Sequence, residues 1–227
     1  MFGNEQVTTQ PIFYLFIAAT ILLSLGYGWG RRRNRRIFLT AFDDLKAILK
    51  PRDQQYTNIG GLSGYHANFL PNKSSVIRRA DVTITLLPRH SWLWYPFSFL
   101  IRKFDRLFLN FELSKSSFGA LKEGHLIEKR YARLAGARIE NADSLQSEEL
   151  TWDGLSFILY FEDEEVKQAF LDCKNRLQQP NTLRHLALVP ERQRIFLFMI
   201  PRMGTVDAVV RPVYDWFHDL LNKSAKG

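Results

Sequence analysis

The sequence predicts an α+β fold: a single N-terminal transmembrane helix, followed by a cytoplasmic domain in which an antiparallel sheet carries helices on one face. Three observations lead to this class. No residue from 6 to 30 is charged, and this run is long enough to span a membrane. Several later segments alternate apolar and polar residues or are rich in β-branched residues, as strands are. Amphipathic segments of helical length lie between them, and a short turn joins two of the strands, which favours antiparallel pairing.

The anchor is expected over 11–30, with a short external N-terminus over 1–10. The run IFYLFIAATILLSL is nearly all apolar, and about 20 residues at 1.5 Å each cover a hydrocarbon core of about 30 Å. Tyr14 lies near one end and Tyr27 and Trp29 near the other, where amphipathic rings favour the membrane–water interface. A cleaved signal peptide would carry its basic residues before the apolar run, whereas here they follow it. A helix in the core of a soluble domain would not hold 25 uncharged residues between aromatic ends.

Five arginines follow the apolar run directly and orient it. They are Arg31, Arg32, Arg33, Arg35 and Arg36, against Glu5 alone on the other flank. Because positively charged flanks stay in the cytoplasm, the rest of the chain is predicted to be cytoplasmic. The run is also a candidate contact site for anionic lipid headgroups or ribosomes, since each arginine near an anionic surface contributes about 1 kcal/mol. A plain topology signal is the alternative interpretation.

The segment 31–77 is interpreted as this basic flank, a juxtamembrane helix and a loop. Apolar residues at helical intervals predict the helix over 37–50, which either continues from the anchor or kinks away from it. Pro51 ends this helix. Residues 52–75 contain several glycines, a proline and asparagines, and we expect them to form a loop.

The cytoplasmic domain is predicted over 78–222, followed by a tail over 223–227. Pro212, inside the last helix, predicts a kink or a late start of that helix. The order strand–helix–strand–strand occurs twice, although the two halves do not match residue by residue. The expected strands are 81–87, 106–113, 126–140, 155–161, 183–189 and 194–200, and the expected helices are 91–104, 163–178 and 205–222.

The composition and the motifs limit which ligands and reactions the chain can support. The chain of 227 residues has a formal net charge of +8, which favours an anionic neighbour: nucleic acid, the ribosome or acidic lipid headgroups. Its single cysteine, Cys173, excludes an intramolecular disulfide. The histidines lack metal-ligand spacing, and the sequence contains no nucleophile elbow and no phosphate-binding loop. We therefore expect no catalytic residue, no cofactor, no metal site and no DNA partner.

The helix expected over 91–104 is apolar on nearly every side, although a surface helix needs only one apolar stripe. The apolar side chains beyond that one stripe are either buried in a larger core, or they contact lipid or another membrane protein. Tryptophan favours membrane interfaces and dominates binding hot spots. The candidate membrane-contact or partner-contact residues are Trp92, Trp94, Tyr95, Phe97 and Phe99.

The order of these features resembles the calumin family, coiled-coil-domain membrane proteins of the PAT complex at the Sec translocon. The similarity lies in the anchor YLFIAATILLSLGYGWG with RRRNRR and RIFLTAFDDLKAILK, in IRRADVTITLLPRHSWLWYPFSFLIRKFDRLFLNFEL, and in LRHLALVPERQRIFLFMIPRMG with its following helix. It covers most of the chain and consists of pattern and order, without a signature motif. The family's acidic segment before the anchor and its basic coiled-coil tail have no counterpart in this sequence, which would suit a prokaryotic, for example archaeal, form.

The resemblance implies a non-enzymatic factor that assists membrane-protein insertion or folding. Its partners would be the Sec translocon and a small membrane protein, and its location the cell membrane, or the endoplasmic reticulum membrane in a eukaryote. A second hypothesis is a membrane-tethered enzyme or lipid-binding domain that uses the region 92–104. A pocket with convergent titratable groups would favour the enzyme, and a flat apolar surface facing the membrane would favour the scaffold.

Overall fold

The computed structural model describes residues 11–72, 75–102, 104–114, 121–135, 139, 142–178 and 180–224. Three short 3₁₀ turns also occur, η3 (Ala142–Ser144), η4 (Pro180–Thr182) and η5 (Pro190–Arg192). The helices are α1 (Pro11–Leu49), α2 (Tyr95–Arg102), α3 (Lys129–Ala135), α4 (Glu164–Arg176) and α5 (Thr205–Ser224). The strands are β1 (Asp53–Asn58), β2 (Gly64–Leu70), β3 (Ile77–Thr85), β4 (Arg106–Leu113), β5 (Gly124–Glu128), β6 (Gln146–Trp152), β7 (Leu155–Phe161), β8 (Leu183–Val189) and β9 (Arg194–Met199).

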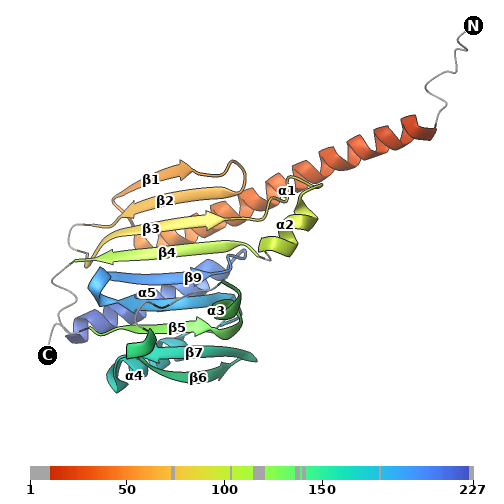
Figure 1. Ribbon diagram of the computed structural model, residues 1–227. Helices are drawn as coiled ribbons and strands as arrows, with labels where there is room; N and C mark the ends of the chain where they lie inside the picture. The colour runs from red at the N-terminus through yellow and green to blue at the C-terminus, as the bar shows by residue number, and fades with distance from the viewer. Residues whose placement is uncertain are drawn as a thin grey trace, which may run out of the picture.

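The strands described above form one nine-stranded sheet in the order β1-β2-β3-β4-β9-β8-β5-β7-β6 (Figure 1). Every neighbouring pair is antiparallel. The α+β class and the antiparallel sheet predicted from the sequence are therefore confirmed. The external N-terminus expected over 1–10 lies outside the described residues.

Helix α1 is a single helix of 39 residues whose two halves have different surroundings. Its N-terminal half, from Pro11 to Leu25, projects from the domain, and its side chains are nearly all exposed (Figure 1). The helix is long and apolar enough to cross a membrane. From Gly26 onward one side of α1 packs on the domain at intervals of three and four residues, so the expected juxtamembrane helix continues from the apolar half without a break. The buried positions are Gly26, Gly30, Asn34, Ile37, Ala41, Phe42, Leu45, Ile48 and Leu49.

Helices α1, α4 and α5 cover one face of the sheet. Phe42 of α1 contacts Phe69 of β2, and Phe111 of β4 contacts Phe217 of α5. Helix α4 joins this layer where its Phe170 meets Trp216 of α5. These apolar contacts form the main core.

The expectation that all helices lie on one face is wrong for α3. Tyr131 of α3 packs on Phe198 of β9, with ring centroids 4.7 Å apart. Phe198 alternates along β9 with Leu197 and Met199, so it points to the opposite face from the main core. Within the segment 126–140, where one strand was expected, residues 126–135 instead form the end of β5 and then α3. The cause is local, because the Glu128 carboxylate accepts hydrogen bonds from the Arg130 and Tyr131 amides and caps the new helix.

The expected loop over 52–75 is also wrong, because it contains the antiparallel hairpin β1–β2. All six residues of β1 are exposed, so its sequence carries no alternation of burial. Backbone hydrogen bonds to β2 keep β1 in the sheet, although none of its side chains is buried. The sheet therefore begins at Asp53. Strand β6, which the sequence did not predict, is an edge strand of the same kind at the other end of the sheet.

Other predicted elements are close to those observed. The strands expected at 106–113, 155–161 and 183–189 match β4, β7 and β8 in full. The hairpin of β8 and β9 is present, whereas α2 is shorter than its prediction. Helix α5 runs through Pro212 from Thr205, so the late start did not occur. The repeated order strand–helix–strand–strand is present as β3–α2–β4–β5 and β7–α4–β8–β9, but β3 pairs with β4 whereas β5 separates β7 from β8.

Two glycines of α1 give a matched test of how closely the helix packs on the domain. A Cβ added at Gly30 would lie 2.1 Å from the Arg89 carbonyl oxygen, whereas one at Gly28 would meet nothing within 4 Å. We expect Gly30→Ala to lower the free energy of unfolding by about 1–3 kcal/mol, because backbone must move to admit the methyl group. Gly28→Ala should be neutral or stabilise by up to about 1 kcal/mol through helix propensity. Thermal melts of the full-length protein in detergent micelles measure both, and equal midpoints would contradict the packing described.

Candidate membrane and partner interface

The loop before α2 docks on α1 where the apolar half of α1 ends. Gly26 lies against the Trp92 ring, which occupies the space that a Cβ would need. Four residues on, Gly30 lies against the backbone of Arg89 and His90. Small residues at this spacing on one helix face allow such close approach. The segment that leads into α2 is therefore fixed at the level of Gly26–Gly30.

A buried polar network holds this contact in place. Asn34 of α1 donates hydrogen bonds from Nδ2 to the carbonyl oxygens of Leu62 and Leu87, at 3.1 and 2.9 Å. Its Oδ1 accepts a hydrogen bond of 3.0 Å from Arg89, and Arg89 forms an ion pair of 2.7 Å with Asp105. Asp105 also accepts from the Leu87 amide at 2.8 Å. A buried ion pair is favourable only when its remaining polar atoms are also hydrogen-bonded, and this network largely meets that condition.

The five arginines of the basic flank are all exposed, in contrast to Asn34 in their midst. The Arg33 guanidinium lies 5.4 Å from the centre of the Trp29 ring, a cation–π contact. Arg31 and Arg35 lie on the side of α1 near Tyr65, where burial raises the pKa of the tyrosine and the two positive charges partly oppose that rise. The arginines therefore stay available to an external anionic partner.

The aromatic residues around α2 are exposed, so the alternative in which they are buried in a larger core does not hold. The exposed fraction is 55% for Trp94, 58% for Phe97 and 74% for Leu100. Ser98 is the buried position of α2 among its described side chains. Tyr95 is half-buried. We call the exposed set the α2 apolar surface: Trp92, Leu93, Trp94, Phe97, Phe99, Leu100 and Ile101.

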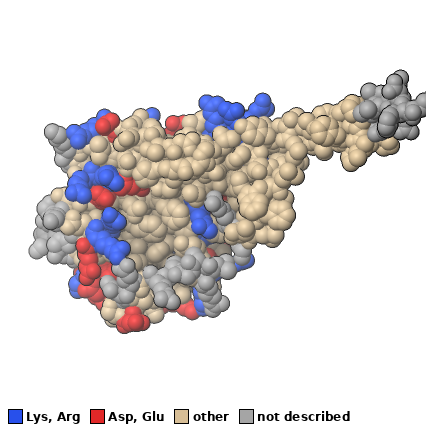
Figure 2. All heavy atoms as spheres, turned by 45° about the horizontal axis from the view of Figure 1, so that its top comes forward, with Lys and Arg blue, Asp and Glu red and all other residues tan. Residues whose placement is uncertain are grey.

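The α2 apolar surface lies beside the apolar half of α1. Both project from the same end of the sheet in Figure 1, and the contact of Trp92 with Gly26 joins them. Figure 2 shows uncharged surface along the projecting helix and over the adjoining part of the domain, with Lys and Arg gathered where α1 meets the domain. Exposed apolar surfaces of this size are typical of sites that contact a membrane or another protein.

An open cavity of about 470 Å³ lies behind this surface. It is bounded by α1, by the segments before and after α2, and by the loop from β9 to α5. Its basic lining residues are Arg33, Arg89 and Arg202, and Asp105 is its acidic one. Apolar side chains such as Phe99 and Met203 complete the wall, so this cavity combines positive charge with an apolar rim.

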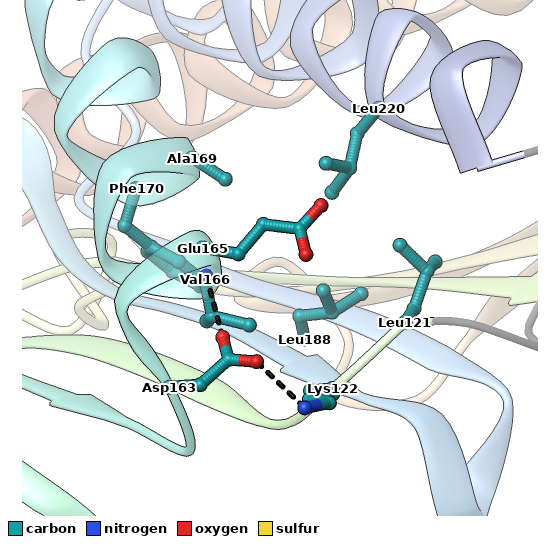
Figure 3. A pocket seen from close by; sticks show the side chains of 9 residues that line it. All are labelled: Leu121, Lys122, Asp163, Glu165, Val166, Ala169, Phe170, Leu188 and Leu220. Carbon is teal, nitrogen blue, oxygen red and sulfur yellow. Dashed lines mark hydrogen bonds and ion pairs between the residues drawn. The ribbon is translucent and has the colours of Figure 1, made fainter. Parts of the chain in front are cut away.

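A second hollow, between α4 and α5, is much smaller, at about 30 Å³ (Figure 3). Asp163 lies at its edge, where it caps α4 through the Val166 amide and pairs with Lys122 at 2.7 Å. The lysine lowers the pKa of that carboxyl. Figure 3 shows Glu165 directed toward Leu220 across the hollow. Its volume suits a water molecule rather than an organic substrate.

Two histidines meet on the sheet face opposite the main core. His125 Nδ1 lies 3.3 Å from His185 Nε2, and Glu123 lies 2.9 Å from His125 Nε2. Burial lowers the pKa of both histidines, to about 3 for His185, where the His125 charge contributes further. Among the described residues no group of three or more His, Cys, Asp or Glu side chains is placed to hold a metal ion. Cys173 is buried, and burial raises the pKa of its thiol.

The sequence interpretation missed Asn34, Arg89, Asp105 and Arg202. One signal was present, because Gly26, Gly30 and Asn34 are spaced four apart and Asn34 interrupts an arginine run. Uncharged small or amide residues at that spacing indicate a packed helix face. The partners of Asn34 are 28 to 55 residues away along the chain, so no local pattern identifies them.

Comparison with family models finds no match for the chain, and comparison with curated protein sequences likewise finds none.

The histidine pair, in which His125 is buried and His185 is partly exposed, predicts a pH dependence of stability. The pKa of His185 is about 3 in the folded protein and about 6.5 when unfolded. Between these values only the unfolded chain binds the proton, so stability falls as the pH falls below about 6.5, by up to about 1.4 kcal/mol per pH unit for one histidine. His185→Gln keeps a hydrogen-bonding side chain and should flatten this slope. Urea unfolding of the full-length protein in micelles at several pH values measures it, and parallel slopes for both proteins would contradict the assignment.

Proposed function

We propose that α1 crosses the cell membrane once, with its arginine flank and the α+β domain in the cytoplasm, and that the protein is a non-enzymatic factor assisting membrane-protein insertion or folding beside the Sec translocon. The observation that carries this proposal is the α2 apolar surface. It is exposed, it is rich in large side chains, and it adjoins the apolar half of α1. Such a surface is costly to leave in water and favours contact with lipid or with another membrane protein.

The geometry of α1 supports a fixed position for this surface. Because α1 is unbroken and packs on the domain from Gly26 to Leu49, the domain cannot turn freely about the anchor. Tyr27 and Trp29 would lie in the interfacial layer and the arginines just outside it. The contact of Trp92 with Gly26 supports a position of the α2 apolar surface at the level of that layer.

The direction toward the translocon rests on the resemblance to the calumin family in the anchor, the aromatic helix and the closing hairpin. A rigidly held apolar surface at the interface is suited to contact an emerging transmembrane helix or a small membrane partner. The exposed arginines suit anionic lipid headgroups, and they add a salt-sensitive attraction to ribosomal RNA.

A lipid-binding domain is the second candidate, and the cavity of about 470 Å³ behind α2 favours it. Its volume falls in the range of small-molecule sites. The two candidates are compatible, because the cavity lies beside the α2 apolar surface and does not replace it. Enzymatic activity remains the weaker hypothesis, since the titratable pair His125–His185 lies on the sheet away from this interface.

Cysteine labelling tests the topology. In a Cys173→Ala background, Asn4→Cys should react with a membrane-impermeant maleimide added outside intact cells, whereas Glu191→Cys, at the exposed turn between β8 and β9, should not. Glu191→Cys should react once the membrane is permeabilised, which serves as the accessibility control. The reverse pattern in intact cells would place the domain outside and overturn the cytoplasmic assignment.

Photo-crosslinking tests the partner role. A photoreactive amino acid at Leu100, which is 74% exposed, should crosslink to translocon subunits or to membrane proteins under synthesis. The same probe at Glu191 is the matched control, because that turn is exposed and lies at the end of the sheet away from α2 (Figure 1). Mass spectrometry identifies the adducts. Lipid adducts alone at Leu100, or identical protein adducts from both positions, would contradict the scaffold role.

A further inference from the structure

The cavity between α1, α2 and the loop from β9 to α5 brings together chain segments that are far apart in sequence. Its volume is about 470 Å³, and it opens to the exterior. Arg33 belongs to α1, Arg89 to the segment after β3, and Arg202 to the loop before α5. The lining residues of the cavity include Arg33, Arg89, Tyr95, Phe99, Arg202 and Met203.

The cavity carries excess positive charge. Three guanidinium groups line it against one carboxylate, that of Asp105, which gives a formal charge of +2. Asp105 is already paired with Arg89 at 2.7 Å. Within the described residues, Arg33 and Arg202 have no carboxylate at ion-pair distance. Two cations therefore face this space without a counter-ion from the protein, and an anionic ligand would supply one.

One buried donor in the wall also lacks an acceptor. The Arg89 side chain is 8% exposed, and its two terminal nitrogens bind Asn34 and Asp105. Its Nε is buried and has no hydrogen-bond partner in the described part of the chain. An unpaired buried donor is unfavourable. Arg89 is therefore a fixed part of the wall, held by Asn34 and Asp105, and the cations open to a ligand are Arg33 and Arg202.

The position of the cavity along α1 matches the headgroup layer of a membrane. Arg33 follows Leu25, the end of the apolar half, by eight residues, or about 12 Å along the helix. This distance lies beyond the hydrocarbon core and within reach of the layer of phosphates. Tyr95, Phe99 and Met203 line the cavity on its apolar side and continue into the α2 apolar surface.

We propose that this cavity binds the phosphate headgroup of an anionic phospholipid, with Arg33 and Arg202 as ligands to the phosphate oxygens. The glycerol backbone and acyl chains leave along Phe99 toward the α2 apolar surface. A soluble phosphate compound has the same oxygen atoms, but it has no apolar part that would contact the apolar wall of the cavity. The inference requires only that α1 enters a membrane, and it stands independently of the translocon role.

Native mass spectrometry of the full-length protein in non-ionic micelles tests the proposal, because it counts bound lipids. Dioctanoyl phosphatidylglycerol should bind saturably with one molecule per chain. Dioctanoyl phosphatidylcholine and glycerol phosphate, at the same concentrations, should bind much more weakly. Arg202→Gln should weaken phosphatidylglycerol binding by about tenfold, the loss expected for one charged hydrogen bond.

Arg35→Gln is the matched control, because Arg35 is an exposed arginine of the same flank that does not line the cavity. It should change binding by less than about twofold, as for a screened surface charge. The Arg202 side chain is exposed, so both variants should melt at the wild-type temperature. Equal losses from both variants, or equal binding of phosphatidylcholine, would overturn the headgroup site. Equal binding of glycerol phosphate would reassign the cavity to a soluble phosphate compound and overturn the lipid proposal.

Discussion

The carbonyl groups of Leu62 and Leu87 both accept hydrogen bonds from the Asn34 amide, and Arg89 bridges that amide to Asp105. These bonds join α1 to the β1–β2 hairpin, to the segment after β3 and to the start of β4. Shifting α1 by one residue would turn Asn34 away by about 100° and leave these partners unpaired in a buried site. The polar network therefore fixes the register of α1, whereas the apolar contacts from Ile37 to Leu49 supply most of the burial energy.

The other features of the interface depend on this register. With Asn34 in place, Gly26 and Gly30 meet the Trp92 ring and the Arg89 backbone, and α2 is held beside the apolar half of the helix. The arginines that flank Asn34 in sequence point outward, except that Arg33 reaches the cavity. Burying a large apolar side chain gains about 1.5–3 kcal/mol. The exposed α2 apolar surface thus represents a large unused binding energy, which a membrane or a partner would recover.

Much of the fold could be predicted from side-chain periodicity, and the two strands that were missed share one cause. Strands β4 and β7 are buried on alternate residues, and their bounds were predicted in full. The edge strand β1 is fully exposed, and in β6 only Leu150 and Trp152 pack partly against the core, so both strands carry too little alternation and were missed. For the interface, composition identified the arginines and the aromatic residues, because these types are unusual in such density. Asn34, Arg89, Asp105 and Arg202 act through contacts between distant segments, and only the tertiary structure brings them together.

The double role of α1 has a consequence for synthesis. Its apolar half is synthesised well before α5, on which its other half packs and whose Asp207 amide donates a hydrogen bond to Asp44. The central strand β4 likewise waits for β9, with Leu107 opposite Met199. An anchored chain would therefore enter the membrane long before its domain can close, leaving Ile37, Phe42 and Leu45 uncovered in the meantime. Such a protein would complete its folding at the bilayer surface. The helix that anchors it there is the one whose second half can pack only after α5 has been synthesised.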